Sequence, residues 1–356
     1  MIKTRVQTIQ KQLAKQEALL VTSAANRFYL TGFESSAGCV LVTDQAANFL
    51  IDSRYVEKAK QVVNSCSVQL SNRSNEEIKE LLNKHGIKRL YLETESASVS
   101  AMKGYAEAFE GVEVSTDNKM DVVLEQMRAV KTRQELALME KAQKLTDDTF
   151  TYILDRIAVG RSEIDVMLDM EFYMRKLGSE GVSFDFIVVS GKNSSLPHGV
   201  PTDKLIESGD FLTMDFGAVV EGYHSDMTRT VAVGSVSEQQ RKVYDTVLKA
   251  QQAALDTVRA GMVCKDVDKV ARDIIYRAGY EGCFGHGLGH SVGIEIHENP
   301  SFNTRCLTCL KPGTIMTVEP GIYLENQFGV RIEDMVYVTE DGCENLTASR
   351  KDLIIL

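Results

Sequence analysis

The stretches GDFLTMDFGAVVEGYHSDMTRT (209–230) and GTIMTVEPGIYLENQFGVRIEDM (313–335) decide the fold of this chain of 356 residues. Each begins with an apolar run that follows a glycine and reaches an acid six residues later, and each contains a second acid that is closely followed by methionine. This spacing predicts two hairpin-like units, each presenting two carboxylates on neighbouring strands. The four acids are Asp215 and Asp226 in the first stretch, and Glu319 and Glu333 in the second.

A pair of helices is predicted before each stretch, so the whole pattern occurs twice. In the first copy a helix reaches residues 157–160, and a second helix follows residues 162–166. In the second copy a helix begins at a capping-box motif (237–240), runs to residues 258–261 and is followed by another helix from 264–267. If the two copies pack about a pseudo-two-fold axis, the four carboxylates converge.

Residues 1–124 have a different pattern, in which helix-like and strand-like segments alternate. This alternation predicts an α/β domain with a largely parallel or mixed sheet. A capping-box motif at Thr132 and Glu135 opens a long helix, so we place an α+β second domain at residues 125–356. The expected strands of the first domain are 18–23, 39–44, 48–53, 67–71 and 89–93, and its expected helices are 56–63, 75–86 and 98–109.

The composition favours a cytoplasmic protein that binds neither nucleic acid nor a membrane. The net charge of −10 is not accompanied by a stripe of Lys and Arg, which argues against a nucleic-acid partner. The N-terminus has no long apolar run, so no secretory signal is expected, and no stretch is long enough to span a bilayer. Seven cysteines without regular spacing suit a reducing cytosol, and the lone pair Cys306 and Cys309 has no second pair for a zinc site.

Five of the six histidines fall between His198 and His297, in the same region as the four acids. Unpaired charges buried beside apolar strands cost several kcal/mol each, and a pair of divalent cations converts this cost into binding energy. Two Asp, two Glu and one His suit two ions about 3.5–4 Å apart, and oxygen-rich ligands favour Mn²⁺, with Co²⁺ or Zn²⁺ as alternatives. Water between such ions becomes a nucleophile near neutral pH, so the predicted chemistry is metal-assisted hydrolysis.

Each of these residues has a simpler interpretation when it is taken alone. An isolated acid is more often a surface or salt-bridged residue than a ligand, but strand alternation places these acids on a buried face. His286 and His290 are four residues apart in a Gly-rich stretch, which argues against a helical zinc pair. His297 is followed by Glu-Asn-Pro, without the second histidine of an HExxH motif.

The combined motifs MDFG…HSDMTRT, HGLGHSVGIEIHENP, TVEPGIY and GVRIEDM resemble those of the Xaa-Pro peptidases, the prolidase and aminopeptidase P branch of the pita-bread metallopeptidases. The resemblance covers essentially the whole chain. It implies a creatinase-like α/β domain over residues 1–124 and a pita-bread catalytic domain with an internal pseudo-two-fold duplication over residues 125–356. It also implies a homodimer that hydrolyses proline-containing dipeptides or short peptides.

The same resemblance implies a role for each site residue. Asp226 and Glu333 bridge two metal ions, Asp215 binds one of them, and His290 and Glu319 bind the other. It implies that His198 helps to hold the substrate and that His297 contacts the scissile group and shuttles a proton. Glu319 is also implied to relay the proton of the attacking water. His286 and Arg331 are implied to lie beside the metals.

Three alternatives remain open beside an Xaa-Pro dipeptidase. An Xaa-Pro aminopeptidase acting on longer peptides shares every residue named above. Methionine aminopeptidase has a similar GH…HExP stretch, but the extra N-terminal domain and His286 argue against it. A catalytically silent pita-bread module that binds a peptide is disfavoured because the ligand pattern is intact.

Overall fold

The computed structural model describes residues 2–72 and 75–356, and the chain divides into an N-terminal unit that ends at Arg128 and a C-terminal unit, Ala129–Leu356. The expected domain boundary, between 124 and 125, lies within helix α6 (Lys119–Ala129). No described helix is both long and apolar enough to cross a membrane.

The N-terminal unit contains a six-stranded mixed sheet with the strand order β4-β3-β2-β1-β5-β6. The strand pairs β1/β2 and β2/β3 are antiparallel, whereas β1/β5, β5/β6 and β3/β4 are parallel. All eight predicted elements are present, and α1, α2, α6 and β6 are additional to them. The bounds are β1 Glu17–Val21, β2 Cys39–Thr43, β3 Ala47–Ile51, β4 Ser67–Leu70, β5 Arg89–Leu92, β6 Glu113–Ser115, α1 Ile2–Gln10, α2 Ala24–Thr31, α3 Val56–Val62, α4 Asn75–Lys84 and α5 Val99–Ala108.

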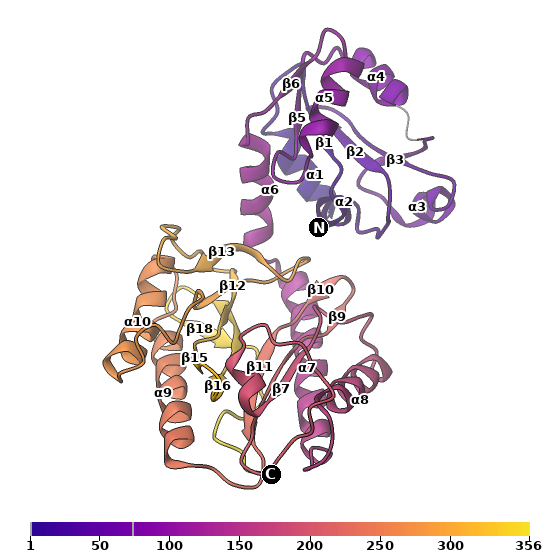
Figure 1. Cartoon of the computed structure of the whole chain (residues 1–356). Helices are drawn as coiled ribbons and strands as arrows, with labels where there is room; N and C mark the ends of the chain where they lie inside the picture. The colour runs from indigo at the N-terminus through magenta and orange to yellow at the C-terminus, as the bar shows by residue number, and fades with distance from the viewer. Residues whose placement is uncertain (1, 73–74) are drawn as a thin grey trace. The chain divides into compact units, whose positions relative to one another are not determined.

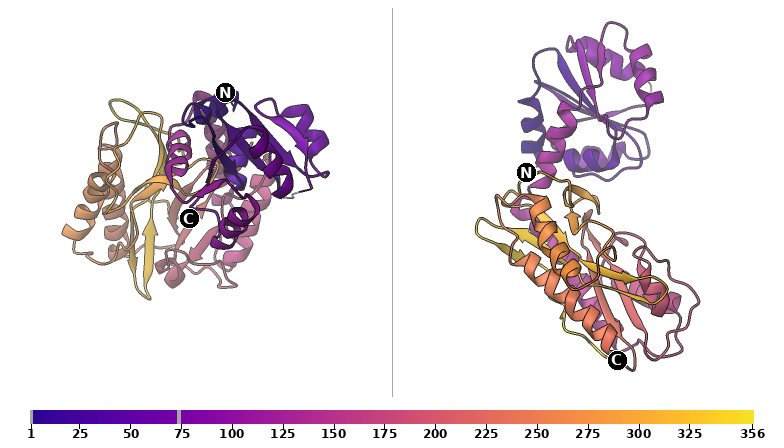
Figure 2. Two further views of the ribbon diagram at one scale, coloured as in Figure 1. Left: turned by 90° about the horizontal axis from the view of Figure 1, so that it is seen from above. Right: turned by 60° about the vertical axis from the view of Figure 1, so that its left-hand side comes forward.

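The C-terminal unit is built from two similar halves. In each half two helices pack on three antiparallel strands, and the two helix pairs flank the strands from opposite sides (Figure 1; Figure 2, left). The first half consists of α7 (Arg133–Leu154), α8 (Glu163–Lys176), β7 (Ile187–Ser190), β8 (Phe211–Phe216) and β11 (Met227–Ala232). The second half consists of α9 (Glu238–Leu255), α10 (Cys264–Arg277), β12 (Gly289–Ser291), β14 (Ile315–Val318) and β17 (Asp334–Val338).

Each half buries its own hydrophobic core between its helices and its sheet. Phe150 of α7, Met170 of α8 and Met214 of β8 belong to one cluster of buried side chains. Val247 of α9 and Met316 of β14 belong to the other. The apolar faces predicted for the helices therefore pack on the strands that carry the acids.

Local backbone contacts repeat between the halves. The N–H of Gly160 donates to the carbonyl of Ile206, and the N–H of Gly261 donates to that of Leu310, both at 2.9 Å. Both glycines have positive φ, +89° and +81°, a conformation that side chains disfavour. The predicted capping boxes of α7 and α9 are both formed.

Shorter strands join the main ones, and two of the hairpins they form lie between the acids of each half. β9 (Val219–Val220) pairs with β10 (Tyr223–His224), and the longer β15 (Gly321–Leu324) pairs with β16 (Phe328–Arg331). This difference in hairpin length accounts for the wider spacing of the second pair of acids. The remaining elements are η1 (Gly191–Ser195), β13 (Glu298–Phe302) and β18 (Cys343–Asn345).

Residues 349–356 run along β11 and contact the second half. Ala232 and Leu356 pair through their backbones at 2.9 Å. The guanidinium of Arg229, which is buried, donates to the carbonyl of Ser349 and to the carboxylate of Asp334, both at 2.7 Å. It also donates to the backbone carbonyl of Glu333. Lys351 forms an ion pair of 2.6 Å with Asp334. The segment thus ties the two halves together next to Glu333.

Candidate metal centre

The four predicted acids lie at the same end of the two sheets because their strands are paired in matching registers. Asp215 of β8 faces Thr228 of β11, and Asp226 immediately precedes β11. Val318 of β14 pairs with Asp334 of β17, so Glu319 follows one strand and Glu333 precedes the other. All four line one cavity of about 870 Å³ within the C-terminal unit.

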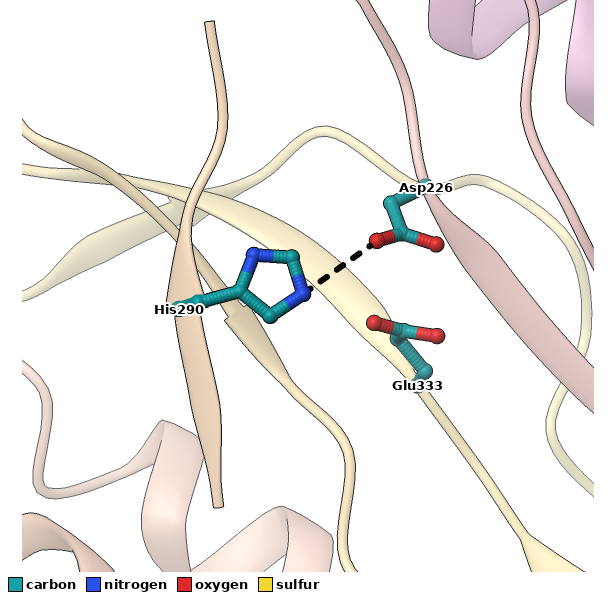
Figure 3. A group of neighbouring side chains, drawn as sticks. All are labelled: Asp226, His290 and Glu333. Carbon is teal, nitrogen blue, oxygen red and sulfur yellow. Dashed lines mark ion pairs between the residues drawn. The ribbon is translucent and has the colours of Figure 1, made fainter. Parts of the chain in front are cut away.

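The tightest group in this cavity is formed by Asp226, His290 and Glu333, which point toward one another from different strands (Figure 3). One ligand-type atom of each lies within 4.8 Å of the others. Nε2 of His290 is 3.5 Å from a carboxylate oxygen of Asp226 and 3.6 Å from one of Glu319. Nδ1 of His290 is 3.1 Å from the carbonyl of Ser291, so a proton on Nδ1 leaves the Nε2 lone pair directed at the acids. This tautomer is the one that a metal ligand requires.

Burial and mutual repulsion disfavour the charged forms of these groups. The pKa of Asp226 is raised well above its usual value by burial and by the charges of Glu333, Asp215 and Glu319. Burial raises the pKa of Glu319 to about 8, and burial together with Glu319 and Asp215 also raises the pKa of Glu333. Burial and the adjacent His297 lower the pKa of His290 to about 4. The acids therefore need a cation to be ionised together.

The donor set fits divalent metal ions. One oxygen each of Asp215 and Asp226 is buried without a hydrogen-bond partner, and such orphaned oxygens are costly unless something positive contacts them. Four carboxylates and one neutral imidazole are hard donors of the kind that Mn²⁺ and similar ions take. Asp215, Asp226, His290, Glu319 and Glu333 are the residues that would hold the ions.

A hydrogen-bonded chain runs beside the acids and centres on Arg331. Its guanidinium is 2.6 Å from Asp215 and donates to Thr228 Oγ1 at 3.0 Å and to the hydroxyl of Tyr323 at 2.8 Å. Tyr323 in turn is 2.9 Å from Nε2 of His286, and Thr228 donates to Glu333 at 2.7 Å. Tyr323 thus links the predicted neighbours His286 and Arg331, and Thr228 links Arg331 to Glu333. The sequence analysis identified neither Tyr323 nor Thr228.

Thr228 and Tyr323 lie inside the quoted motifs, but the sequence could have identified only one of them as a site residue. Thr228 is the residue that a β8/β11 hairpin places opposite Asp215, so correct pairing would have found it. Tyr323 is reached only through the β15/β16 hairpin, in which Gly321 pairs with Arg331. The sequence gives no indication of that register.

His198 and His297 are exposed residues that line the same cavity. The ring centroid of His297 lies 4.4 Å from that of His290. Burial and the neighbouring His198 lower the pKa of His297, so its neutral form prevails near pH 7. All nine residues predicted for the site therefore line one cavity, and their individual roles stay predictions.

The cavity is also lined by apolar residues, here called the apolar wall, which come mostly from the first half. It can take an uncharged side chain or a pyrrolidine ring. The wall includes Ile164, Met167, Val182, Phe184, Phe186, Ile187, Pro197, Val200, Pro201, Ile296 and Phe302.

Comparison with known proteins agrees with both the fold and the acids. The profile of metallopeptidase family M24 matches residues 137–340, and that of the creatinase/prolidase N-terminal domain matches residues 5–130. The chain belongs to metallopeptidase family M24. Membership confirms the resemblance, the pita-bread fold with its creatinase-type N-terminal domain, and binding of divalent metal by an enzyme of the peptidase class.

Several relatives match along nearly the whole of this M24 chain. The solved structure of an Xaa-Pro dipeptidase from Bacillus anthracis is 38% identical, with a TM-score of 0.95 and full coverage of both chains. An Xaa-Pro dipeptidase of Pyrococcus horikoshii is 36% identical over 95% of this chain and 94% of its own. The X-Pro aminopeptidase structure from Thermotoga maritima is 35% identical, with a TM-score of 0.89, and covers 98% of this chain and 100% of its own.

Proposed function

We propose that this chain is an Xaa-Pro dipeptidase, which hydrolyses the bond between an N-terminal residue and proline. The observation that carries the proposal is the meeting of four buried or half-buried carboxylates and His290 with two exposed imidazoles in one cavity. Support comes from relatives that bear this name and are similar over nearly their whole length.

We further propose that the centre takes two Mn²⁺ ions, which Asp215, Asp226, His290, Glu319 and Glu333 would hold, and that the protein is a cytoplasmic homodimer. Two bound divalent ions supply positive charge that polarises the scissile carbonyl and lowers the pKa of water. The chain's own contribution is to hold the acids in place around that charge. Thr228 and Arg331 orient Glu333 and Asp215 for this task.

Proton transfer in this proposal uses Glu319 and His297. Glu319 accepts a proton from the attacking water in this proposal, because its carboxylate lines the cavity beside His290. His297 takes up a proton and donates it from its imidazole to the leaving imino nitrogen of proline. The lowered pKa of His297 makes its protonated form a ready donor. An Xaa-Pro bond has no N–H, so recognition here does not depend on that donor.

An Xaa-Pro aminopeptidase is the second candidate, and one observation favours it. Among the described residues that line the cavity, Arg331 is the only Lys or Arg, and its guanidinium is already paired with Asp215. A dipeptide presents a free carboxylate on proline, whereas a longer peptide presents a neutral amide there. The longer substrate needs no additional cation from these residues.

The deciding experiment compares Ala-Pro with Ala-Pro-Ala on protein that has been stripped of metal and reloaded with Mn²⁺, Co²⁺ or Zn²⁺. Release of proline from Ala-Pro at a kcat/KM above that for cleavage of Ala-Pro-Ala supports the dipeptidase. The reverse order supports the aminopeptidase. Elemental analysis accompanies the assay, since a chain that binds no metal and cleaves neither peptide is a binding module.

A further inference from the structure

A buried lysine outside the cavity contacts the residues that follow two of the site histidines. Nζ of Lys131 donates to Ser291 Oγ and to a carboxylate oxygen of Glu298, each at 3.0 Å. The side chains of Lys131 and Glu298 are 1% and 4% exposed. Ser291 follows His290 in the chain, and Glu298 follows His297.

The backbone on both sides of this contact is firmly placed. The N–H of Lys131 donates to the carbonyl of Gly313 at 2.8 Å, and the next residue, Thr132, is the N-cap of α7. Ser291 and Glu298 pair across the β12/β13 hairpin, which has a bulge between His290 and Ser291. A bulge lets strand register vary, so a cross-link at this point restricts it.

Glu298 also holds the loop that leads to His297. Its other carboxylate oxygen accepts the N–H of Ile294 at 3.0 Å and that of Glu295 at 3.3 Å. A Cβ at Gly293 would lie 2.5 Å from this carboxylate, so a larger residue there would push the carboxylate out of its present position. The loop and the hairpin are therefore both fixed by groups that Lys131 contacts.

We propose that Lys131 is a positioning residue for peptide hydrolysis, which sets the separation of His290 and His297 by tying Ser291 to Glu298. Neither Lys131 nor Ser291 lines the cavity, so the ammonium acts from outside it. The ring separation of 4.4 Å is the quantity that it maintains. The expected change in kcat rests on the proposed function. The expected change in the His290–His297 ring separation rests on geometry alone.

The test uses the Mn²⁺-loaded full chain and two variants. Lys131→Met leaves the Glu298 carboxylate buried without this ammonium, and we expect a lower Tm and a kcat reduced about 10²-fold, as misplacement of a catalytic group usually gives, with KM changed less than about 3-fold. Lys131→Met combined with Glu298→Gln removes the charge imbalance. We expect the double variant to regain most of the Tm and to keep the low kcat.

Recovery of kcat together with Tm in the double variant would overturn the proposal, because Lys131 would then only neutralise Glu298. Lys204→Met is the matched control, since Lys204 forms a half-buried ion pair of 2.7 Å with Asp210 and contacts neither β12 nor β13 through it. Its kcat is expected to equal that of the wild type.

A crystal structure of the double variant gives a readout that does not depend on activity. We expect the His290–His297 ring separation to differ from that of the wild type, and an unchanged separation would overturn the proposal. If the wild-type chain cleaves no Xaa-Pro bond, the proposed function fails, while this comparison still decides the role of Lys131.

Discussion

The two halves of the C-terminal unit share a scaffold but not a chemistry. Both place a pair of acids at the same end of three antiparallel strands, although the sheet of the second half has five strands in all. Thr213 and Thr317 are in matching positions of β8 and β14. Thr213 pairs with Val189 of β7, whereas the register of Ser291 with Met316 places His290 of β12 opposite Thr317. A buried valine in one half is therefore replaced by the imidazole of the metal group in the other.

This difference shows how a nearly symmetric group of acids can become a site that binds its substrate in one orientation. Acids alone, related by a pseudo-two-fold axis, do not distinguish one side of the ions from the other. The imidazoles of His286, His290 and His297 come from the second half, and most of the apolar wall comes from the first. A substrate that needs both is held in one orientation.

The largest effect is expected from neutralising one acid of either half. Asp226→Asn and Glu333→Gln should each reduce activity to background and lower metal affinity, because the remaining oxygens no longer offset the charge of two ions. Titration calorimetry with Mn²⁺ and the Ala-Pro assay measure the two losses. Circular dichroism is expected to show an unchanged fold, and metal affinity retained in only one of the two variants would mean that the halves contribute unequally.

A smaller loss is expected when the second half loses its exposed imidazole. His297→Ala should reduce kcat by about 10²–10⁴-fold, the usual contribution of a general acid or base. Metal content measured by elemental analysis should stay at the wild-type level, since His297 is not among the predicted ligands. Unimpaired turnover in this variant would contradict its assigned role.

The contact that joins the halves beside the metals can be removed with one hydroxyl. Thr228→Val deletes the hydrogen bonds from Thr228 to Glu333 and from Arg331 to Thr228 while keeping the β-branched shape. We expect Mn²⁺ affinity to fall about 10- to 100-fold, as it does when other outer partners of metal ligands are removed. Thr213→Val, which removes another buried threonine hydroxyl of the first half, is the comparison, because Thr213 is hydrogen-bonded to Thr230 rather than to a predicted ligand. An effect on affinity below about 3-fold would mean that Glu333 is oriented without Thr228.

The repulsion between the acids should make the metal-free protein less stable at higher pH. The folded-state pKa of Glu319 is raised to about 8, so the native state binds a proton that the unfolded state releases, and stability falls as pH rises through that value. Between pH 7 and 8 the loss from Glu319 alone is about 1 kcal/mol.

Urea unfolding in a chelating buffer measures this slope. Asp226 and Glu333 act in the same direction, so Glu319→Gln should reduce the slope without removing it. A slope of the opposite sign would show that the acids are ionised in the metal-free protein.

The smallest effect concerns the helix starts, where the halves also differ. The side chain of Ser162 caps α8 in a capping box with Asp165, whereas Val263 at the start of α10 provides no side-chain cap. Val263→Ser recreates the spacing with Asp266 and should add about 0.5 kcal/mol to the free energy of unfolding, and Ser162→Ala should remove about 1 kcal/mol. Urea unfolding at constant metal concentration measures both. If the two substitutions changed the free energy of unfolding by equal and opposite amounts, the surroundings of the two helix starts would have no effect on the strength of the cap.

The sequence predicted the fold well where it carried a repeated local signal. The glycine-to-acid spacing and the two capping boxes predicted the duplication. The alternation of helix-like and strand-like segments predicted five of the strands in the N-terminal unit. Helices α1, α2 and α6 were missed, although α6 with 11 residues is longer than the predicted helices α3, α4 and α5. The acids were found because strand periodicity makes burial visible in the sequence.

The rest of the site depends on pairing between distant strands. Tyr323 joins His286 to Arg331 only because β15 and β16 fold back on each other. Lys131 reaches Ser291 and Glu298 across 160 and 167 residues of chain. No local pattern predicts such contacts, because the partners are chosen by tertiary packing.

The metal centre also depends on a segment outside the cavity, residues 349–356. None of its residues, all described, lines the cavity. Its backbone nevertheless receives the guanidinium of Arg229, and Lys351 neutralises Asp334 beside Glu333. A protease that removed these residues would leave every predicted ligand in the chain. It would nevertheless expose the buried ion pair of Arg229 and Asp334, and we expect the enzyme to lose activity as a result.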